Sequence, residues 1–359
     1  MLCSVAIKWA HMALRYLSVL DQSPISAGMT GGDALRNSIS LARTADALGY
    51  RRYWLAEHHG TAMLAGASPE ILIGLIAHET ARIRVGSGGI MLPHYSPLKV
   101  SETFSLLSAL TPGRIDLAVG RAAGTDPMTA FALQRDRRQA APDDFPEQLS
   151  ELLAYVRDGL PHGHRFQRVA QLPGGSARPT PWLLGSSPQS GLWAAELGLP
   201  YAFADFINPH GAEVARRYRA SFIPTDMQPV PYVVVAVWAL AAETRDEAQR
   251  LATSARVAFL NFLQGTPIPV PPVADAEAFL REHPEALAAA VRSRRSILGS
   301  PDDVRQDIEK VAAEYQADEV MIVTITHEHA VRARSYELVA RAFGLAGDGR
   351  SLETQTAQP

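Results

Sequence analysis

Residues 84–120, RVGSGGIMLPHYSPLKVSETFSLLSALTPGRIDLAVG, contain the pattern that decides the fold. A short apolar run at 84–91 is followed by Ser96-Pro97, a typical helix start, because serine caps a helix and proline suits its first position. Apolar side chains then recur at helical spacing until Pro112-Gly113, and a second apolar run follows at 115–120. A strand, a helix and a strand joined by short loops predict two parallel strands connected by a crossover helix.

The same alternation extends in both directions from this stretch. Six further runs are predicted to be strands: Arg15–Leu20, Arg52–Glu57, Trp182–Gly185, Tyr201–Phe206, Tyr232–Leu240 and Glu319–Thr326. Between the first two, Asp33 is the predicted N-cap of a helix that ends at Gly49. The total of eight strands closes a barrel. The alternative, an open doubly wound sheet, uses fewer strands and usually opens with a glycine-rich dinucleotide loop, which this sequence lacks. The sequence therefore predicts a single (β/α)8 TIM barrel, an α/β fold.

Several segments lie outside this alternation. Residues 1–12 are predicted to be an N-terminal extension before a barrel domain at 13–346, and residues 347–359 a mobile tail. Within the barrel domain, residues 126–178 combine helical pieces with a Gly/Pro/His-rich connection and are interpreted as an insertion after the fourth strand. Residues 265–295 begin with a proline-rich run that cannot be regular helix or interior strand, and they are interpreted as a lid after the seventh strand.

Composition and charge exclude several function classes. The 359 residues include 34 Lys+Arg against 37 Asp+Glu, a net charge of −3, so the chain has no basic field for gripping nucleic acid. A single cysteine, Cys3, excludes a disulfide framework and a zinc site built on thiolates. No apolar stretch approaches the ~20 residues that span a membrane, and the opening segment is too short for a secretory signal. We therefore expect a cytoplasmic protein that acts on small molecules.

In such a barrel the functional groups lie where strands end, on the carboxyl-terminal face. The second predicted strand ends in Glu57-His58-His59. Strand alternation places His58 on the face of Trp54 and Ala56, and His59 on the opposite face with Glu57. A neutral imidazole is suited to moving a proton near pH 7, whereas the structural alternative is two packed histidines. A metal site is disfavoured, because the adjacent pair lacks i, i+4 helical spacing and no third ligand is near in the sequence.

Other strand ends carry glycines and potential anion ligands. Glycines within 86–89 either permit the close approach of a flat ligand or mark a bulge. Arg121 follows the fourth strand, and Ser187 and Ser190 lie at a strand-to-helix turn after the fifth. A guanidinium, hydroxyls and the free N–H groups of a helix start can converge on a phosphate. The alternative is ordinary serine capping beside a surface arginine.

Several separated segments resemble the luciferase-like flavin monooxygenases, the family of the bacterial luciferase alpha chain. The matching segments are LDQSP at 20–24, AEHH at 56–59, GSGGIMLP at 86–93, PGRIDLAVGR at 112–121 and SSPQSGLWAAELGLP at 186–200. They cover the first third of the chain densely, with one later patch, and occur in the family's order.

The resemblance implies an FMN-dependent monooxygenase. Reduced FMN, supplied by a separate flavin reductase, would react with O2 to give a flavin C4a-peroxide that oxidises a small organic substrate. His58 would be the proton-handling catalytic residue beside the flavin, with His59 as its supporting neighbour. The implied FMN-binding positions are Ser87, Gly88, Gly89, Gly120, Arg121, Ser186, Ser187 and Ser190, with a cis peptide between Gly88 and Gly89. No metal is implied.

Two positions depart from the family pattern. Gly120 stands where the luciferase alpha chain has a reactive cysteine, which argues against light emission, and Ser186 replaces an acidic residue near the phosphate. The resemblance also implies a homodimer formed through the apolar helices at 68–83 and 96–111. Two alternatives stay open: an F420-dependent hydride-transfer enzyme on the same fold, and a flavin-binding protein without turnover.

Overall fold

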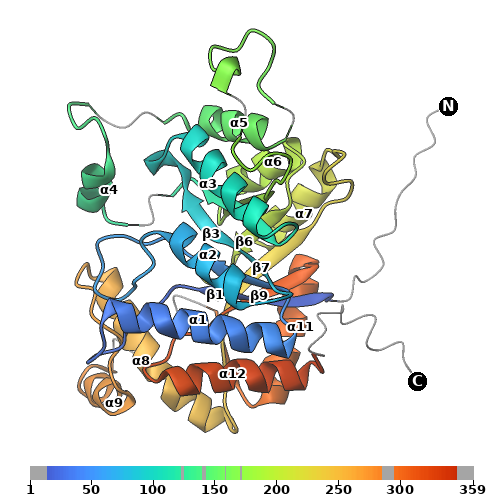
Figure 1. Cartoon of the computed structure of the whole chain (residues 1–359). Coiled ribbons are helices and arrows are strands. Elements are labelled where there is room, and N and C mark those ends of the chain that lie inside the picture. Colours follow the sequence, from blue (N-terminus) through green and yellow to red (C-terminus); the bar gives the residue numbers. More distant parts are fainter. Residues whose placement is uncertain are drawn as a thin grey trace, which may run out of the picture.

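A computed structural model of the chain describes residues 14–122, 125–139, 143–157, 159–169, 172–284 and 295–345. The predicted extension at 1–12 and the predicted tail at 347–359 lie outside these residues. Parallel strands form a closed barrel, and helices surround it (Figure 1). The barrel strands are β1 (Tyr16–Asp21), β2 (Arg52–Leu55), β3 (Arg84–Met91), β4 (Ile115–Gly120), β5 (Thr180–Gly185), β6 (Tyr201–Ala204), β7 (Val233–Ala241) and β9 (Glu319–Val323). Each pairs with its sequence neighbour, and β9 pairs with both β7 and β1 to close the ring, so the predicted TIM barrel is confirmed.

A ninth strand that the sequence analysis missed lies outside the barrel. This strand, β8 (Ser296–Gly299), pairs in the structure with the end of β7, where Trp238–Ala241 lie beside it. It has only four residues and is followed directly by the helix start Ser300-Pro301. β2 and β6 are equally short and were predicted, so length alone does not explain this difference. The eight predicted strands already close a barrel, and the pattern did not call for a ninth.

Helices cross between the strands and cover the barrel (Figure 1). The crossover helices are α1 (Gly31–Leu48), α2 (Pro69–Glu79), α3 (Pro97–Leu110), α6 (Pro188–Glu196), α7 (Ala212–Ser221) and α11 (Pro301–Tyr315), and α12 (His329–Ala342) follows the last strand. Between β4 and β5 lie α4 (Pro127–Leu133) and α5 (Phe145–Val156), in the range interpreted as an insertion. Between β7 and β8 lie α8 (Arg245–Leu263) and α9 (Val273–Glu282). Short 3-10 turns occupy Leu92–His94 and Gln167–Val169.

The start of α1 differs from the prediction. Thr30, not Asp33, is the N-cap, and Asp33 is the third helical residue of a reciprocal capping box with Thr30. Both residue types cap helices well, so the sequence pattern alone placed the cap three residues late. The predicted end is confirmed, because Gly49 adopts a left-handed φ of 91° and its N–H closes the last turn.

The barrel interior has a charged floor beneath an apolar layer. Arg52 contacts Asp116 at 2.7 Å and Glu319 at 3.0 Å, and Arg84 also contacts Asp116. Burial opposes the ionisation of Asp116, but the two arginines outweigh it and lower the pKa of this carboxyl to about 2. The Trp54 indole N–H donates to Asp116 at 3.0 Å. All these charges lie at or near the amino ends of their strands, so they close the barrel at the end away from the predicted site.

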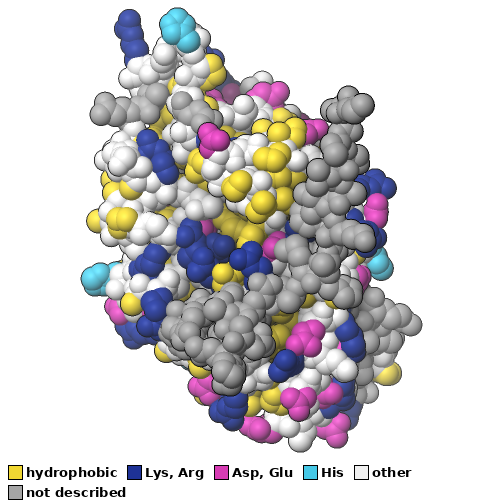
Figure 2. Space-filling model, turned by 90° about the vertical axis from the view of Figure 1, so that its right-hand side faces the viewer, with side chains coloured by type: hydrophobic (Ala, Val, Ile, Leu, Met, Phe, Trp, Pro, Cys, Tyr) yellow, Lys and Arg dark blue, Asp and Glu magenta, His cyan; other side chains and the backbone are white. Residues whose placement is uncertain are grey.

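Arginines precede or begin most of the early strands, at positions 15, 51, 52, 82, 84 and 114. Figure 2 looks at the side of the molecule where β1 begins, and Lys and Arg side chains gather near the middle of this face. No helix in the described part of the chain is both long and apolar enough to cross a membrane.

Candidate active site

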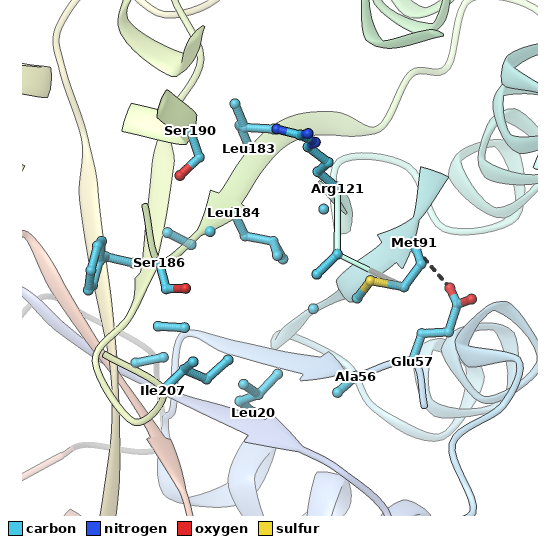
Figure 3. A pocket seen from close by; sticks show the side chains of 18 of the residues that line it. Leu20, Ala56, Glu57, Met91, Arg121, Leu183, Leu184, Ser186, Ser190 and Ile207 are labelled. Atoms are coloured by element: carbon cyan, nitrogen blue, oxygen red, sulfur yellow. Dashed lines mark hydrogen bonds between the residues drawn. The ribbon is translucent and has the colours of Figure 1, made fainter. Parts of the chain in front are cut away.

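A cavity of about 440 Å³ opens at the carboxyl ends of the barrel strands (Figure 3). Its wall is mostly apolar and includes Leu20, Trp54, Ala56, Met91, Leu183, Leu184, Ala202, Phe206, Ile207, Ala236 and Met321. Seven of the predicted site residues line this one cavity: His58, Gly88, Gly120, Arg121, Ser186, Ser187 and Ser190. The residues predicted from strand ends, among them His58, Gly88 and Arg121, therefore lie around one cavity.

His58 lies just beyond the end of β2 and faces the cavity with Trp54 and Ala56, as strand alternation predicted. Its Nδ1 atom is buried and has no hydrogen-bond partner among the described residues. Burial, with a smaller effect from His59, lowers the pKa of His58 from its usual 6.5 to about 4. The ring is therefore neutral at pH 7, with nitrogen atoms available to a ligand.

A hydrogen-bond network behind His58 joins β2 to the segment after β3. The buried Glu57 carboxylate contacts His59 Nε2 at 2.8 Å and accepts from the Tyr95 hydroxyl and the Met91 N–H, each at 3.0 Å. Figure 3 shows the bond from Met91 to Glu57 at the edge of the cavity. Burial raises the pKa of Tyr95, and the Glu57 carboxylate adds to this effect. The network thus fixes the chain on either side of His58, a role that the sequence did not reveal.

The glycines after β3 are required by close packing. The peptide between Gly88 and Gly89 is cis, as the resemblance implied. A Cβ atom on Gly88 would lie 2.6 Å from Leu20 Cδ1, and one on Gly89 would lie 2.6 Å from Leu184 Cδ2. Any side chain at either position would displace its neighbours, and at Gly88 the main chain itself forms part of the cavity surface.

Three predicted site residues do not line the cavity. His59 points to Glu57, Gly89 packs closely against Leu184 and the Ala118 carbonyl, and the buried Ser87 hydroxyl donates to that carbonyl at 2.8 Å. Side chains alternate along a strand, so a motif such as 86–89 sends only part of its residues to one face. The described residues contain no group of three or more His, Cys, Asp or Glu that could hold a metal ion.

The start of α6 supplies the polar side of the cavity. Ser187 is the N-cap, and its hydroxyl accepts from the Ser190 N–H at 3.4 Å. The Ser190 hydroxyl donates to the Ser187 carbonyl at 2.8 Å and lies 2.9 Å from the Tyr201 hydroxyl. The capping interpretation of these serines is therefore correct, and it places the positive end of the helix dipole at the cavity. Ser186 lies on the preceding loop, where its carbonyl accepts from the Asn208 side chain at 3.0 Å.

Arg121 lies at the rim of the cavity, beside Leu183 (Figure 3). Its guanidinium carbon lies 5.9 Å from the centre of the Trp193 ring, and its Nη2 atom lies 2.9 Å from the Asp143 carboxylate. The Trp193 ring packs in turn against Phe145, with 5.6 Å between the two ring centres. The sequence analysis did not identify Trp193 or Phe145 as site residues. Trp193 stands three residues after Ser190 on one helix face, a signal that could have found it, whereas Phe145 carries no such signal.

The predicted lid contributes nothing to the cavity wall within its described residues, 265–284 and 295. Val270 forms a bridge with Ser26, which fixes the proline-rich run to the loop after β1. Residues 285–294 lie outside the described part of the chain.

Comparison with known proteins places the chain in a family. The profile of the family described as luciferase-like monooxygenase matches residues 16–319. The chain belongs to the luciferase-like monooxygenase family. The predicted family is thus confirmed, and the chain is an oxidoreductase of the monooxygenase type.

Individual members of the luciferase-like monooxygenase family align over most of the chain. An uncharacterised Bacillus subtilis protein, YwcH, is 43% identical over 91% of this chain and 98% of its own length. N-acetyl-S-alkylcysteine monooxygenase of Bacillus subtilis is 36% identical over 91% of this chain and 97% of its own length. The crystal structure of apo-MsnO8 is 42% identical and superposes with a TM-score of 0.83, covering 94% of this chain and 99% of that one.

More distant structures of the same fold differ in their cofactors. The oxygenating constituent of 3,6-diketocamphane monooxygenase from Pseudomonas putida, 19% identical with a TM-score of 0.66, was solved in complex with FMN. An F420-dependent secondary alcohol dehydrogenase, 14% identical with a TM-score of 0.63, was solved with an F420-acetone adduct. Similarity this distant establishes the fold alone and does not choose a cofactor.

Proposed function

We propose that the chain is an FMN-dependent monooxygenase that uses reduced FMN and O2 to oxidise a small organic substrate. The observation that carries the proposal is the convergence of His58, the Gly88 main chain and the start of α6 on one cavity. The apolar wall suits a flat tricyclic ring, and Arg121, Ser187 and Ser190 at the rim suit a phosphate. When bound, FMN would supply the electrons and the site of oxygen activation.

The chain's own residues would perform the remaining tasks. Arg121, Ser187 and Ser190, with the N–H groups of the first turn of α6, would bind the flavin phosphate. Gly88 would leave room for the ring, and the apolar wall would exclude water from the reaction. His58, neutral at pH 7, would hold or move a proton at its ring nitrogens.

The proposed catalytic role of His58 is tested by His58→Ala. We expect turnover to fall about 10²–10⁴-fold, the range for loss of an acid or base, while the affinity for FMN changes much less. The measurement is the rate of substrate oxidation at saturating reduced FMN, together with an equilibrium titration of FMN. Turnover equal to wild type would remove His58 from the mechanism.

The side chains of the cavity wall also limit the charge that a bound substrate can carry. Among the described residues that line the cavity, the titratable side chains are Glu57, His58 and Arg121, and the Glu57 carboxylate is already engaged. We therefore propose a substrate whose reacting part is apolar and uncharged, because a buried unpaired charge is costly. An S-alkyl group, which the name of the related Bacillus subtilis monooxygenase contains, meets this description.

The overall proposal is tested by mixing purified protein anaerobically with reduced FMN and an N-acetyl-S-alkylcysteine, then adding ¹⁸O2. We expect one ¹⁸O atom in the product, detected by mass spectrometry. Tight flavin binding without labelled product from this or a dialkyl sulfide probe would favour the flavin-binding protein without turnover. Reduction of a substrate by reduced F420, with no oxygen consumed in the presence of reduced FMN, would favour the hydride-transfer alternative.

We further propose that the chain is a cytoplasmic homodimer that receives reduced FMN from a separate flavin reductase. Support for self-association comes from α2 and α3, where Ile71, Leu75, Leu106 and Leu110 expose between 48% and 81% of their surface. Large apolar side chains gathered on neighbouring helices are typical of an interface. Light scattering tests this proposal, with a mass twice the chain mass of 38.8 kDa as the expected result. The lid at 265–295 and the insertion at 126–178 stay predictions.

A further inference from the structure

The arginine proposed to bind phosphate already has an acidic partner. Arg121 Nη2 lies 2.9 Å from Asp143 Oδ2, and 52% of the arginine side chain and 74% of the aspartate side chain are exposed. Among the described residues that line the cavity, Arg121 is the single Lys or Arg. A phosphate that reaches this arginine therefore meets a carboxylate on the same guanidinium.

The fold holds Asp143 in this position. Phe145, two residues further along, is buried with 2% of its surface exposed and lines the cavity. Its ring packs against Trp193, which also lies beside the Arg121 guanidinium. The aromatic pair thus anchors the backbone two residues from Asp143 and also lies beside the Arg121 side chain, which places the ion pair next to the cavity.

The ion pair of Arg121 and Asp143 changes how strongly the rim attracts a phosphate. A phosphate monoester carries about −1.5 to −2 charges at pH 7. The cation of Arg121 attracts it, but the carboxylate of Asp143 repels it at close range and occupies one arm of the guanidinium. The pair brings no net positive charge to the rim, which leaves the start of α6 and the remaining N–H groups of Arg121 to favour the anion.

We propose that Asp143 is a specificity-determining residue that weakens binding of the flavin phosphate, so that FMN enters and leaves as a co-substrate instead of staying bound. This inference rests on the proposed function, because it takes Arg121 as the phosphate ligand. A protein that receives reduced flavin from another enzyme must also release the oxidised flavin. A carboxylate on the phosphate-binding arginine provides for this release without altering the part of the site that would hold the ring.

The test compares Asp143→Asn with wild type by titrating oxidised FMN and riboflavin, followed by flavin fluorescence. Asparagine keeps the shape of aspartate and removes its charge. We expect the FMN dissociation constant to fall about fivefold at low salt, the effect of one unit charge at close range in water. The gain should shrink in 1 M salt, where charges are screened beyond about 3 Å. The riboflavin dissociation constant should stay unchanged, because riboflavin has no phosphate.

The matched control is Asp136→Asn. Asp136 lies in the same connection but pairs with Arg138, at 2.8 Å, and not with Arg121. Its substitution changes the net charge by the same amount as Asp143→Asn. We expect it to leave both dissociation constants at wild-type values. Thermal unfolding of both variants verifies that they fold.

Three results separate this inference from the proposed function. Unchanged or weaker FMN binding by Asp143→Asn, with wild type binding FMN, would overturn the inference and leave the proposed function intact. An equal gain for riboflavin would also overturn it, since the effect would not act through the phosphate. Failure of wild type to bind FMN or reduced FMN at all would instead overturn the proposed function.

Discussion

The histidine at the cavity makes the stability of the protein depend on pH in a specific way. In the folded chain, burial and the neighbouring His59 lower the pKa of His58 to about 4, against about 6.5 in an unfolded chain. Between these values the unfolded state binds the proton and the folded state does not. The contribution of His58 is therefore fully present above about pH 6.5 and is lost as the pH falls toward 4.

The size of this effect follows from the two pKa values. The full difference corresponds to about 3 kcal/mol, and about 2 kcal/mol of it is lost between about pH 7 and about pH 5. Substituting glutamine for His58 removes the titrating imidazole and keeps a polar side chain. The His58→Gln variant should therefore lose about 2 kcal/mol less stability over this interval than wild type does.

The assay is urea unfolding of wild type and His58→Gln at about pH 7 and about pH 5, with the free energies of unfolding compared as differences. His78→Gln is the matched control, because His78 is exposed near the end of α2 and its imidazole meets solvent in both states. This control should follow wild type at both pH values. An identical pH dependence in wild type and His58→Gln would refute the burial argument, and with it the neutral imidazole in the proposed mechanism.

Three further predictions concern the phosphate, the glycines and the interface. Arg121→Ala should weaken FMN binding by about 1.5 kcal/mol, a low value for a charge-assisted contact because about half of the arginine side chain is exposed. A fluorescence titration should show unchanged riboflavin binding, and an unchanged FMN dissociation constant would remove Arg121 from the site. Gly88→Ala should cost about 1–3 kcal/mol in urea unfolding, because its Cβ would lie 2.6 Å from Leu20 Cδ1. Gly31→Ala, whose Cβ would have no neighbour closer than 3.8 Å, should stay within about 0.5 kcal/mol of wild type, and equal costs at the two sites would contradict the packing argument. Leu75→Lys should convert a dimer to a monomer of 38.8 kDa in light scattering, because 49% of the Leu75 surface is exposed in the chain and a charge there would oppose an apolar interface. The circular dichroism spectrum should stay unchanged. A dimer that persists would place the interface elsewhere.

The barrel could be predicted from the sequence because its signals are local. Each of its strands is a short apolar run next to a helix with recognisable ends, such as the run before Ser96-Pro97. Two details were predicted incorrectly, for different reasons. The eight predicted strands already complete a barrel, so the pattern did not call for the outlying β8, and Thr30 and Asp33 were both acceptable as caps.

The candidate site was predicted in part. The rule that functional groups lie at strand ends found His58, Gly88 and Arg121 without three-dimensional information. It could not tell that Ser87 bonds to a neighbouring strand, since that depends on the register between β3 and β4. Nor could it place Asp143 on Arg121, because the contact depends on the path of a long connection that has no periodic pattern.

A crystal structure of the protein with FMN tests the central claim most directly. We expect the phosphate to lie within hydrogen-bond distance of Arg121 and the first turn of α6, with the ring inside the barrel mouth near His58 and Gly88. A flavin bound elsewhere, or bound here with its phosphate directed away from Arg121 and α6, would contradict the assignment of the site.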